Sequence, residues 1–188
     1  MILPESFYNR STLRIAQDLL GKFLIRRLAN GKKLAGEIIE TEAYMGPRDK
    51  ASHASRGLTP RTALMFGPAG FSYIYLIYGM YYCLNIVTER DGYPAAVLIR
   101  AVRPVSGLAI PDKYLSAPEK LASGPGKLCR EFQIDKTLNG FNICSSGDLF
   151  IEDRGIKVPS SKIIRTPRIG VDYAGEYNNK KWRFLIKK

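Results

Sequence analysis

The sequence predicts an α+β fold, in which a curved and largely antiparallel β-sheet core is surrounded by helices. Runs rich in aromatic and β-branched residues outnumber helical patterns along the chain. These runs come in pairs joined by short turns, and they do not alternate with helices as βαβ units do. The length of 188 residues suits a single domain, residues 1–188, that buries its own core without disulfides or metals.

The first elements are a helix and a hairpin. Residues 11–21 begin with Ser and Thr, carry apolar side chains at helical spacing and close on Gly21, which predicts a helix. Residues 22–44 contain two strand-like runs around Asn30-Gly31, a strong signal for a hairpin turn. Residues 55–70 are rich in turn-forming residues and predict one short helix.

The middle of the chain predicts a second hairpin and a long strand. Residues 71–88 are strand-like except around Tyr78-Gly79, where we expect two strands to join. An Asp-Gly turn then leads into residues 95–104, a nearly continuous apolar strand. After it we expect a surface connection over residues 104–119 and a helix over 123–134 with proline in its first turn. Two short strands should follow, at 148–153 and 180–188.

The charge balance points to a polyanionic partner. Lysine and arginine outnumber aspartate and glutamate by 29 to 17, a net charge of +12. Such an excess attracts nucleic acid first and anionic membrane surfaces second, although a merely solubilising surface has the same composition. The sequence has no apolar run long enough to cross a membrane and no secretion-signal pattern at its start. Three widely spaced cysteines indicate reduced thiols.

Several reaction classes lack their motifs. His53 is the only histidine, so His-rich zinc sites and HExxH are absent. Neither GxxxxGK[ST], nor a strand-borne GxGxxG, nor GxSxG occurs. We therefore expect no metal and no cofactor. A Cys–His nucleophile pair would have to use His53, and nothing near it in the sequence supports one.

Carboxylate chemistry remains, and the stretch "IETEAYMGP" at residues 39–47 is the candidate. Residues two apart on a strand face the same side, so one face should carry four residues if the strand is straight: Ile38, Glu40, Glu42 and Tyr44. The following Gly-Pro would end the strand and place Glu42 and Tyr44 near the mouth of a pocket. The alternative is a solvated strand face on which a glutamate pairs with a lysine.

Tyrosines are dense between residues 73 and 82, where five occur. Tyr78 falls at the tip of the expected hairpin, where an exposed aromatic is costly unless it touches a partner. Aromatic side chains can wedge between bases or stack on unpaired ones. The alternative is cross-strand packing in the core, which we expect for about half of the five.

Two polar residues lie in otherwise apolar strands, Asn85 and Arg100. Each needs a partner if it is buried. We expect Arg100 to lie opposite a carboxylate, and Glu42 is the natural candidate. The alternative is that both point to solvent at strand ends.

Five segments together carry a family resemblance: "EIIETEAYMGPRDKASHASRGLTPRTALMF", "YIYLIYGMYYCLNIV", "AVLIRAVRP", "SGPGKLCREFQI" and "RIGVDYAGEYNNKKWRF". In this order they resemble the alkyladenine (3-methyladenine) DNA glycosylase family, typified by the mammalian enzyme. The resemblance runs from about residue 5 to the C-terminus. It implies an enzyme that flips an alkylated or deaminated purine out of duplex DNA and hydrolyses its N-glycosidic bond.

The resemblance also implies a catalytic set. Glu42 would activate a water molecule as general base, and Arg100 would position that water together with the backbone carbonyl of Val171. Glu40 would have a supporting role. The implied reaction needs no covalent nucleophile, and lysine-dependent lyase chemistry has no lysine in the implied pocket segments.

The implied binding residues surround the flipped base. Tyr44, His53 and Tyr75 would line the pocket and sandwich the base. Tyr78 would enter the minor groove and fill the gap that the base leaves. Asn85 would clash with the exocyclic amine of guanine and so exclude it.

The implied partner is double-stranded DNA that contains a damaged purine of the 3-methyladenine, hypoxanthine or ethenoadenine class. We expect a monomer that needs no membrane and resides in the cytoplasm with the nucleoid in a bacterium, or in the nucleus in a eukaryote. Two alternatives stay open: a non-catalytic nucleic-acid-binding module, and a hydrolase of small nucleosides. The first explains the charge and the tyrosines, but not the Glu42 face and Arg100.

Overall fold

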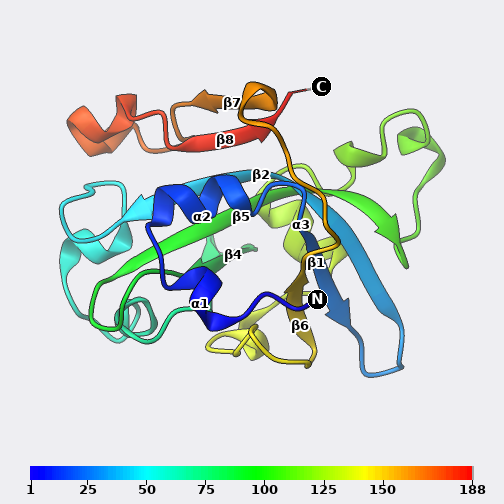
Figure 1. Cartoon of the computed structure of the whole chain (residues 1–188), viewed down its shortest axis with the longest axis horizontal. Helices are drawn as coiled ribbons and strands as arrows, with labels where there is room; N and C mark the ends of the chain where they lie inside the picture. The colour runs from blue at the N-terminus through cyan, green and yellow to red at the C-terminus, as the bar shows by residue number, and fades with distance from the viewer. Residues whose placement is uncertain (188) are drawn as a thin grey trace.

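Eight strands form one antiparallel sheet in the computed structural model, which describes residues 1–187 (Figure 1). The sheet order is β3-β4-β5-β2-β1-β6, with β8 paired to β2 and β7 paired to β8. The strands are β1 (Phe23–Arg27), β2 (Lys33–Met45), β3 (Ser72–Ile77), β4 (Tyr81–Val87), β5 (Ala95–Ser106), β6 (Leu149–Glu152), β7 (Ile163–Thr166) and β8 (Arg183–Ile186).

Short helices and loops cover this sheet. The α-helices are α1 (Glu5–Tyr8), α2 (Thr12–Asp18) and α3 (Pro125–Glu131). The 3-10 helices are η1 (His53–Arg56), η2 (Ala63–Phe66), η3 (Asp112–Tyr114), η4 (Pro118–Lys120), η5 (Lys136–Leu138), η6 (Ser160–Lys162) and η7 (Asp172–Asn179).

The main core lies where the helices pack on the sheet. Helix α2 crosses β2 and β5 (Figure 1), and the Thr41 hydroxyl of β2 donates a hydrogen bond of 2.6 Å to the Ala16 carbonyl of α2. The largest cluster of buried apolar side chains joins α2, α3 and the central strands, and includes Ile15, Leu19, Ile38, Ile86, Val97, Val102, Leu128 and Phe132. This core fixes the strands whose ends carry the candidate site.

The predicted α+β class and its antiparallel sheet are confirmed. Two strands join at Tyr78-Gly79, and α3 begins with Pro125 in its first turn, as expected. The hairpin around Gly31 has a longer loop than a two-residue turn, because β1 ends at Arg27 and β2 begins at Lys33. Strand β7, whose four residues are all partly or well exposed, was not predicted, since it has no buried face to give a periodic pattern.

Strands β2 and β5 shift register between Ala35 and Gly36 and again around Glu40, beside the site. Ile38 pairs with Val102 and Thr41 with Ile99, but Ile39 and Arg100 have no partner between them. The expectation that Ile38 shares a face with Glu40 was wrong, because the bulge between them resets the alternation of β2. Ile38 packs in the main core instead. Irregularities of this kind re-aim side chains, and here the re-aimed side chain is Arg100.

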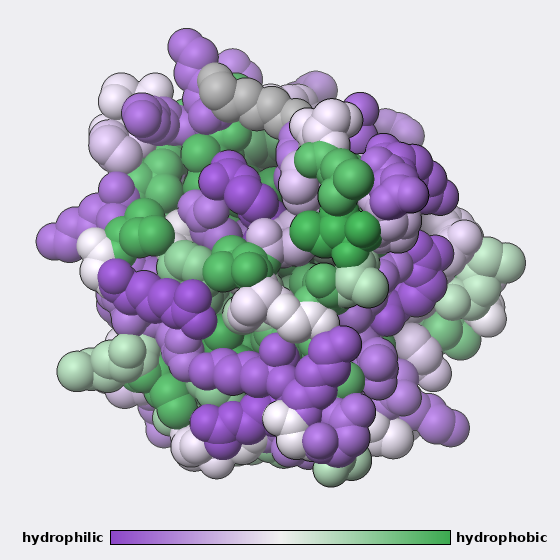
Figure 2. All heavy atoms as spheres, turned by 90° about the vertical axis from the view of Figure 1, so that its right-hand side faces the viewer, coloured by the Kyte–Doolittle hydropathy of each residue, from purple (hydrophilic) through white to green (hydrophobic). Residues whose placement is uncertain are grey.

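The side of the molecule that carries the end of β5 shows no single apolar patch. Figure 2 shows apolar side chains interspersed with hydrophilic ones on this face. Leu115 and Val105 are among the exposed apolar residues, at 64% and 49% exposure. Scattered exposed apolar residues are normal on a protein surface.

Candidate active site

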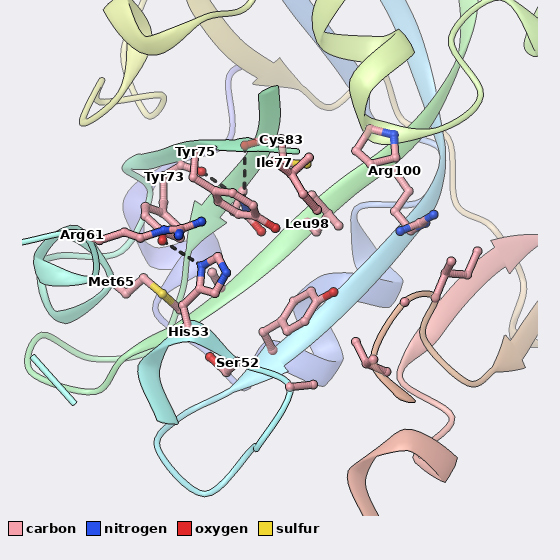
Figure 3. A pocket seen from close by; sticks show the side chains of 18 of the residues that line it. Ser52, His53, Arg61, Met65, Tyr73, Tyr75, Ile77, Cys83, Leu98 and Arg100 are labelled. Carbon is pink, nitrogen blue, oxygen red and sulfur yellow. Dashed lines mark hydrogen bonds between the residues drawn. The ribbon is translucent and has the colours of Figure 1, made fainter. Parts of the chain in front are cut away.

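One pocket brings most of the predicted site residues together (Figure 3). It lies between the end of β2, the strands β3, β4 and β5, and the segment that leads into η7. Its volume is about 140 Å³, close to the roughly 150 Å³ of an engineered cavity that admits benzene. The lining includes Tyr44, His53, Arg61, Tyr73, Tyr75, Cys83, Asn85, Arg100, Ile169, Val171 and Tyr173.

Glu42 lies directly behind this lining. Its side chain is fully buried, and its Oε2 accepts hydrogen bonds from the Tyr44 hydroxyl at 2.9 Å and from Arg100 Nη1 at 3.2 Å. Its Oε1 accepts one from the backbone N–H of Ile169 at 2.9 Å. A carboxylate can accept about four hydrogen bonds, so these three leave capacity for one more at Oε1.

Arg100 joins two carboxylates of the same strand face. Its Nε donates to Glu40 Oε1 at 2.9 Å while its Nη1 contacts Glu42, so the expected ion pair with Glu42 is present. Arg183 of β8 donates to the same Glu40 oxygen at 2.7 Å. Two acids and two arginines therefore balance in charge beside the pocket, which rules out the alternative of a solvated strand face.

Aromatic rings form the walls of the pocket. The His53 and Tyr75 ring centroids are 4.6 Å apart in an edge arrangement, and Figure 3 shows both on the opposite side of the pocket from Arg100. Tyr44 comes from the end of β2 and is a third wall. Burial raises the pKa of the Tyr75 hydroxyl and, together with the Glu42 charge, that of the Tyr44 hydroxyl. Both phenols are therefore protonated donors at neutral pH.

His53 is uncharged at neutral pH. Burial, together with the nearby cations Arg61 and Arg56, lowers the pKa of its ring to about 4. Its Nδ1 is 2.9 Å from the Tyr73 hydroxyl. A neutral ring offers a flat face to a base without adding charge to the pocket.

Asn85 and Val171 also lie where the sequence predicted a site. Asn85 is 3% exposed and its Nδ2 donates to the Tyr73 carbonyl at 3.1 Å. Val171 lines the pocket, and its carbonyl accepts the Ala174 N–H at 2.9 Å, which leaves one lone pair free. Both residues thus present a fixed polar group at the pocket.

Tyr78 lies outside the pocket, at the tip of the β3–β4 hairpin. It is 81% exposed and has a φ of 53°, and Gly79 follows with a φ of 69°. The Met80 N–H donates to the Ile77 carbonyl at 3.2 Å, and two positive φ angles inside such a four-residue turn are those of type I′. A bulky residue rarely adopts this conformation, and such strain clusters at functional sites.

The comparisons with known proteins identify the family. A profile of methylpurine-DNA glycosylases matches residues 6–188. The chain belongs to the methylpurine-DNA glycosylase family. The expected resemblance is thereby confirmed, and the chain is a DNA glycosylase.

Three relatives of this glycosylase cover nearly the whole chain. A protein of Methanocella arvoryzae is 54% identical over 189 residues, which cover 99% of this chain and 92% of that protein. A protein of Alkaliphilus oremlandii is 47% identical, with 100% and 96% covered, and one of Myxococcus xanthus is 45% identical, with 98% and 90% covered. All three are provisionally named 3-methyladenine DNA glycosylases.

Sequence reasoning missed part of the glycosylase pocket. Arg61 lies over the Tyr75 ring, 5.2 Å from its centroid, and Ile169 and Tyr173 form part of the rim. These residues come from loops without periodicity, so only their place in the family motifs could have drawn attention to them. Among residues 1–187 there is no metal-binding group of His, Cys, Asp and Glu, and none of the described helices is long and apolar enough to span a membrane.

Proposed function

We propose that this glycosylase flips alkylated or deaminated purines out of duplex DNA and hydrolyses the N-glycosidic bond with a water molecule activated by Glu42. The observation that carries the proposal is the geometry of Glu42. Its buried carboxylate is joined to two pocket-lining groups, the Tyr44 hydroxyl and Arg100, and keeps capacity for one further hydrogen bond. That remaining position suits a water molecule next to the flipped nucleotide.

The chemistry requires a negative group at this place. Loss of a purine from deoxyribose passes through an oxocarbenium-like sugar, as other glycoside hydrolyses do. The Glu42 carboxylate stabilises that positive charge and takes a proton from water, for which general-base help contributes roughly 10²–10⁴-fold in rate. Arg100 and the Val171 carbonyl hold the water, and no covalent intermediate is needed.

The walls suit a damaged purine. In DNA, 3-methyladenine carries a positive charge and leaves without strong acid assistance, and such a cationic base stacks well on the faces of Tyr44 and Tyr75. The neutral His53 ring adds a face without electrostatic repulsion. Asn85 excludes guanine by contact with its exocyclic amine, and damaged or mispaired bases flip at lower cost than intact ones.

The surface outside the pocket accounts for DNA binding. The +12 net charge gives contacts to phosphates that weaken with salt. Tyr78 at the exposed hairpin tip enters the minor groove and fills the space that the flipped base leaves. We propose that one copy of the chain acts on each lesion, because all groups of the site come from a single chain.

A panel of duplexes with one lesion each, assayed for abasic sites, tests this function. We expect release of 3-methyladenine, hypoxanthine or ethenoadenine, no turnover of the free nucleosides, and a steep loss of binding with salt. Tight binding without release of any of these bases would instead indicate a non-catalytic module. Turnover of free nucleosides with little salt dependence would indicate a nucleoside hydrolase.

A further inference from the structure

A second ion pair lies behind the pocket wall, between Arg168 and Asp49. Both side chains are fully buried, at 0% exposure each. Arg168 Nη2 donates to Asp49 Oδ1 at 2.8 Å, and Nη1 donates to Oδ2, so the contact is bidentate. Arg168 Nη1 also donates to the Ala43 carbonyl of β2 at 2.9 Å.

The pair ties together two segments that each supply part of the site. Asp49 accepts the backbone N–H of Met45 at 3.0 Å and of Ala51 at 3.1 Å, which folds the loop that leads from β2 to His53. Arg168 immediately precedes Ile169, whose N–H donates to Glu42. The loop that carries His53 and the segment that holds the Glu42 carboxylate are therefore joined through one buried contact.

Arg168 also supports the Tyr44 wall. Its guanidinium carbon lies 4.8 Å from the centroid of the Tyr44 ring and 5.0 Å from that of Trp182. Tyr44 lines the pocket and Arg168 does not, so the guanidinium supports the ring from outside the pocket. Arg168 therefore contacts the Tyr44 ring, and the residue that follows it, Ile169, binds the Glu42 carboxylate.

Stability alone does not explain this pair. Removing two charges from water costs several kcal/mol per ion, and apolar replacements of buried pairs are often as stable or more stable. Among residues 1–187, Arg168 Nε is one of the few buried polar atoms that have no hydrogen-bond partner. The pair supplies a fixed geometry, because its planar bidentate contact restrains the loop that carries Asp49 relative to the segment that carries Arg168.

We propose that Arg168 and Asp49 are positioning residues, which hold the Tyr44 wall and the Ile169–Glu42 contact in the arrangement that hydrolysis requires. This inference rests on the proposed role of Glu42. Neither residue touches the base. Their loss acts through Glu42 and Tyr44, and a misplacement of about 1 Å at a reacting centre can cost roughly 100-fold in rate.

The test is the variant Asp49→Asn, which keeps the shape of the side chain and removes its charge. Single-turnover base release is measured with enzyme in excess over a lesion duplex, together with the Kd for that duplex, at a temperature where circular dichroism shows the variant folded. We expect the rate constant to fall roughly 10-fold to 100-fold while the Kd changes little. A folded Asp49→Asn protein that releases the base at the wild-type rate would overturn the proposal.

Lys22→Gln is the control, because it breaks the ion pair of another buried cation, Lys22, with the partly exposed Asp153 at 2.8 Å, and neither residue lines the pocket. We expect it to lower Tm and leave the rate constant unchanged; a loss of rate equal to that of Asp49→Asn would also overturn the proposal. If Asp49→Asn does not fold, the variant Arg168→Lys tests the positioning role in its place. Lysine keeps the positive charge but cannot make the planar bidentate contact of a guanidinium. Base release by Arg168→Lys at the wild-type rate would therefore refute the positioning role.

The failure of this inference differs from a failure of the proposed function. A wild-type protein that releases no base from any lesion duplex would refute the function. A working wild-type protein whose Glu42→Gln variant is inactive, but whose Asp49→Asn and Arg168→Lys variants excise at full rate, would refute the positioning role alone.

Discussion

Arg100 Nη1 lies 3.2 Å from Glu42 Oε2, at the point where β2 and β5 lose their register. The bulge leaves Arg100 without a cross-strand partner, and its guanidinium reaches both acids on the neighbouring strand. This contact joins the carboxylate proposed to activate water with the cation proposed to position that water.

Arg100→Lys tests whether catalysis needs the contacts of Arg100 with both Glu40 and Glu42. A lysine ammonium is a single point charge and cannot reproduce a guanidinium that contacts Glu40 and Glu42 through different nitrogens. We expect the single-turnover rate of base release to fall roughly 10-fold to 100-fold, with a smaller change in duplex affinity. Arg103→Lys, on an exposed pair with Glu37 of the same two strands, is the control and should excise at the wild-type rate. Equal rates for Arg100→Lys and the wild type would contradict the proposed role.

His53 predicts how stability depends on pH. Its pKa is about 4 in the folded protein against an ordinary value of 6.5, because burial and two arginines disfavour the charged ring. Between these values the unfolded chain binds a proton that the folded protein does not, so the free energy of unfolding decreases as pH falls. Because His53 is the only histidine, the drop in Tm from about pH 7 to about pH 5 should be smaller in His53→Gln. An equal drop in both proteins would show that His53 titrates normally.

Tyr78→Ala should separate flipping from binding. The side chain is 81% exposed at the hairpin tip, so its removal leaves the fold intact and removes only the proposed wedge. We expect the stopped-flow fluorescence change of a flipped ethenoadenine to shrink or slow, while initial duplex binding weakens less. Ile164→Ala, at an exposed position of β7, serves as the control. A fluorescence trace identical to that of the wild type would refute the wedge.

Asn85 should determine whether guanine is excluded. Its amide is 3% exposed at the pocket and held by the Tyr73 carbonyl, so it cannot swing away from an incoming base. Asn85→Ala removes the group that meets the exocyclic amine, and we expect slow release of undamaged guanine that the wild type does not show. Abasic sites opposite cytosine in an undamaged duplex measure this gain. Their absence in a folded variant would count against the steric role.

The sequence predicted the elements that bury an apolar face and missed those that do not. Strands β3, β4 and β5 and helix α3 have strong local patterns, and all lie where expected. Strand β7 has no buried face, and the bulge at Arg100 leaves no local signal because it depends on how β2 and β5 pair. Local sequence determines whether a segment forms a helix or a strand, whereas the register of a strand depends on partner strands far along the chain.

The site shows the same division. The spacing of Glu42 and Tyr44 on one strand face was sufficient to predict that they lie together, and their hydrogen bond is present. The Arg168–Asp49 pair joins residues 119 positions apart, so neither periodicity nor spacing could suggest it. Long-range pairs of this kind follow from tertiary packing and become visible only in the folded chain.

Glu42→Gln shows whether Glu42 activates the water. Glutamine keeps the size of the side chain and an acceptor oxygen but cannot take a proton from water. The measurement is single-turnover release of hypoxanthine or 3-methyladenine, beside the affinity for the same duplex and Tm. We expect the rate of base release to fall by roughly 10²–10⁴-fold, while the duplex affinity and Tm stay near their wild-type values. Base release by Glu42→Gln at the wild-type rate would contradict this role.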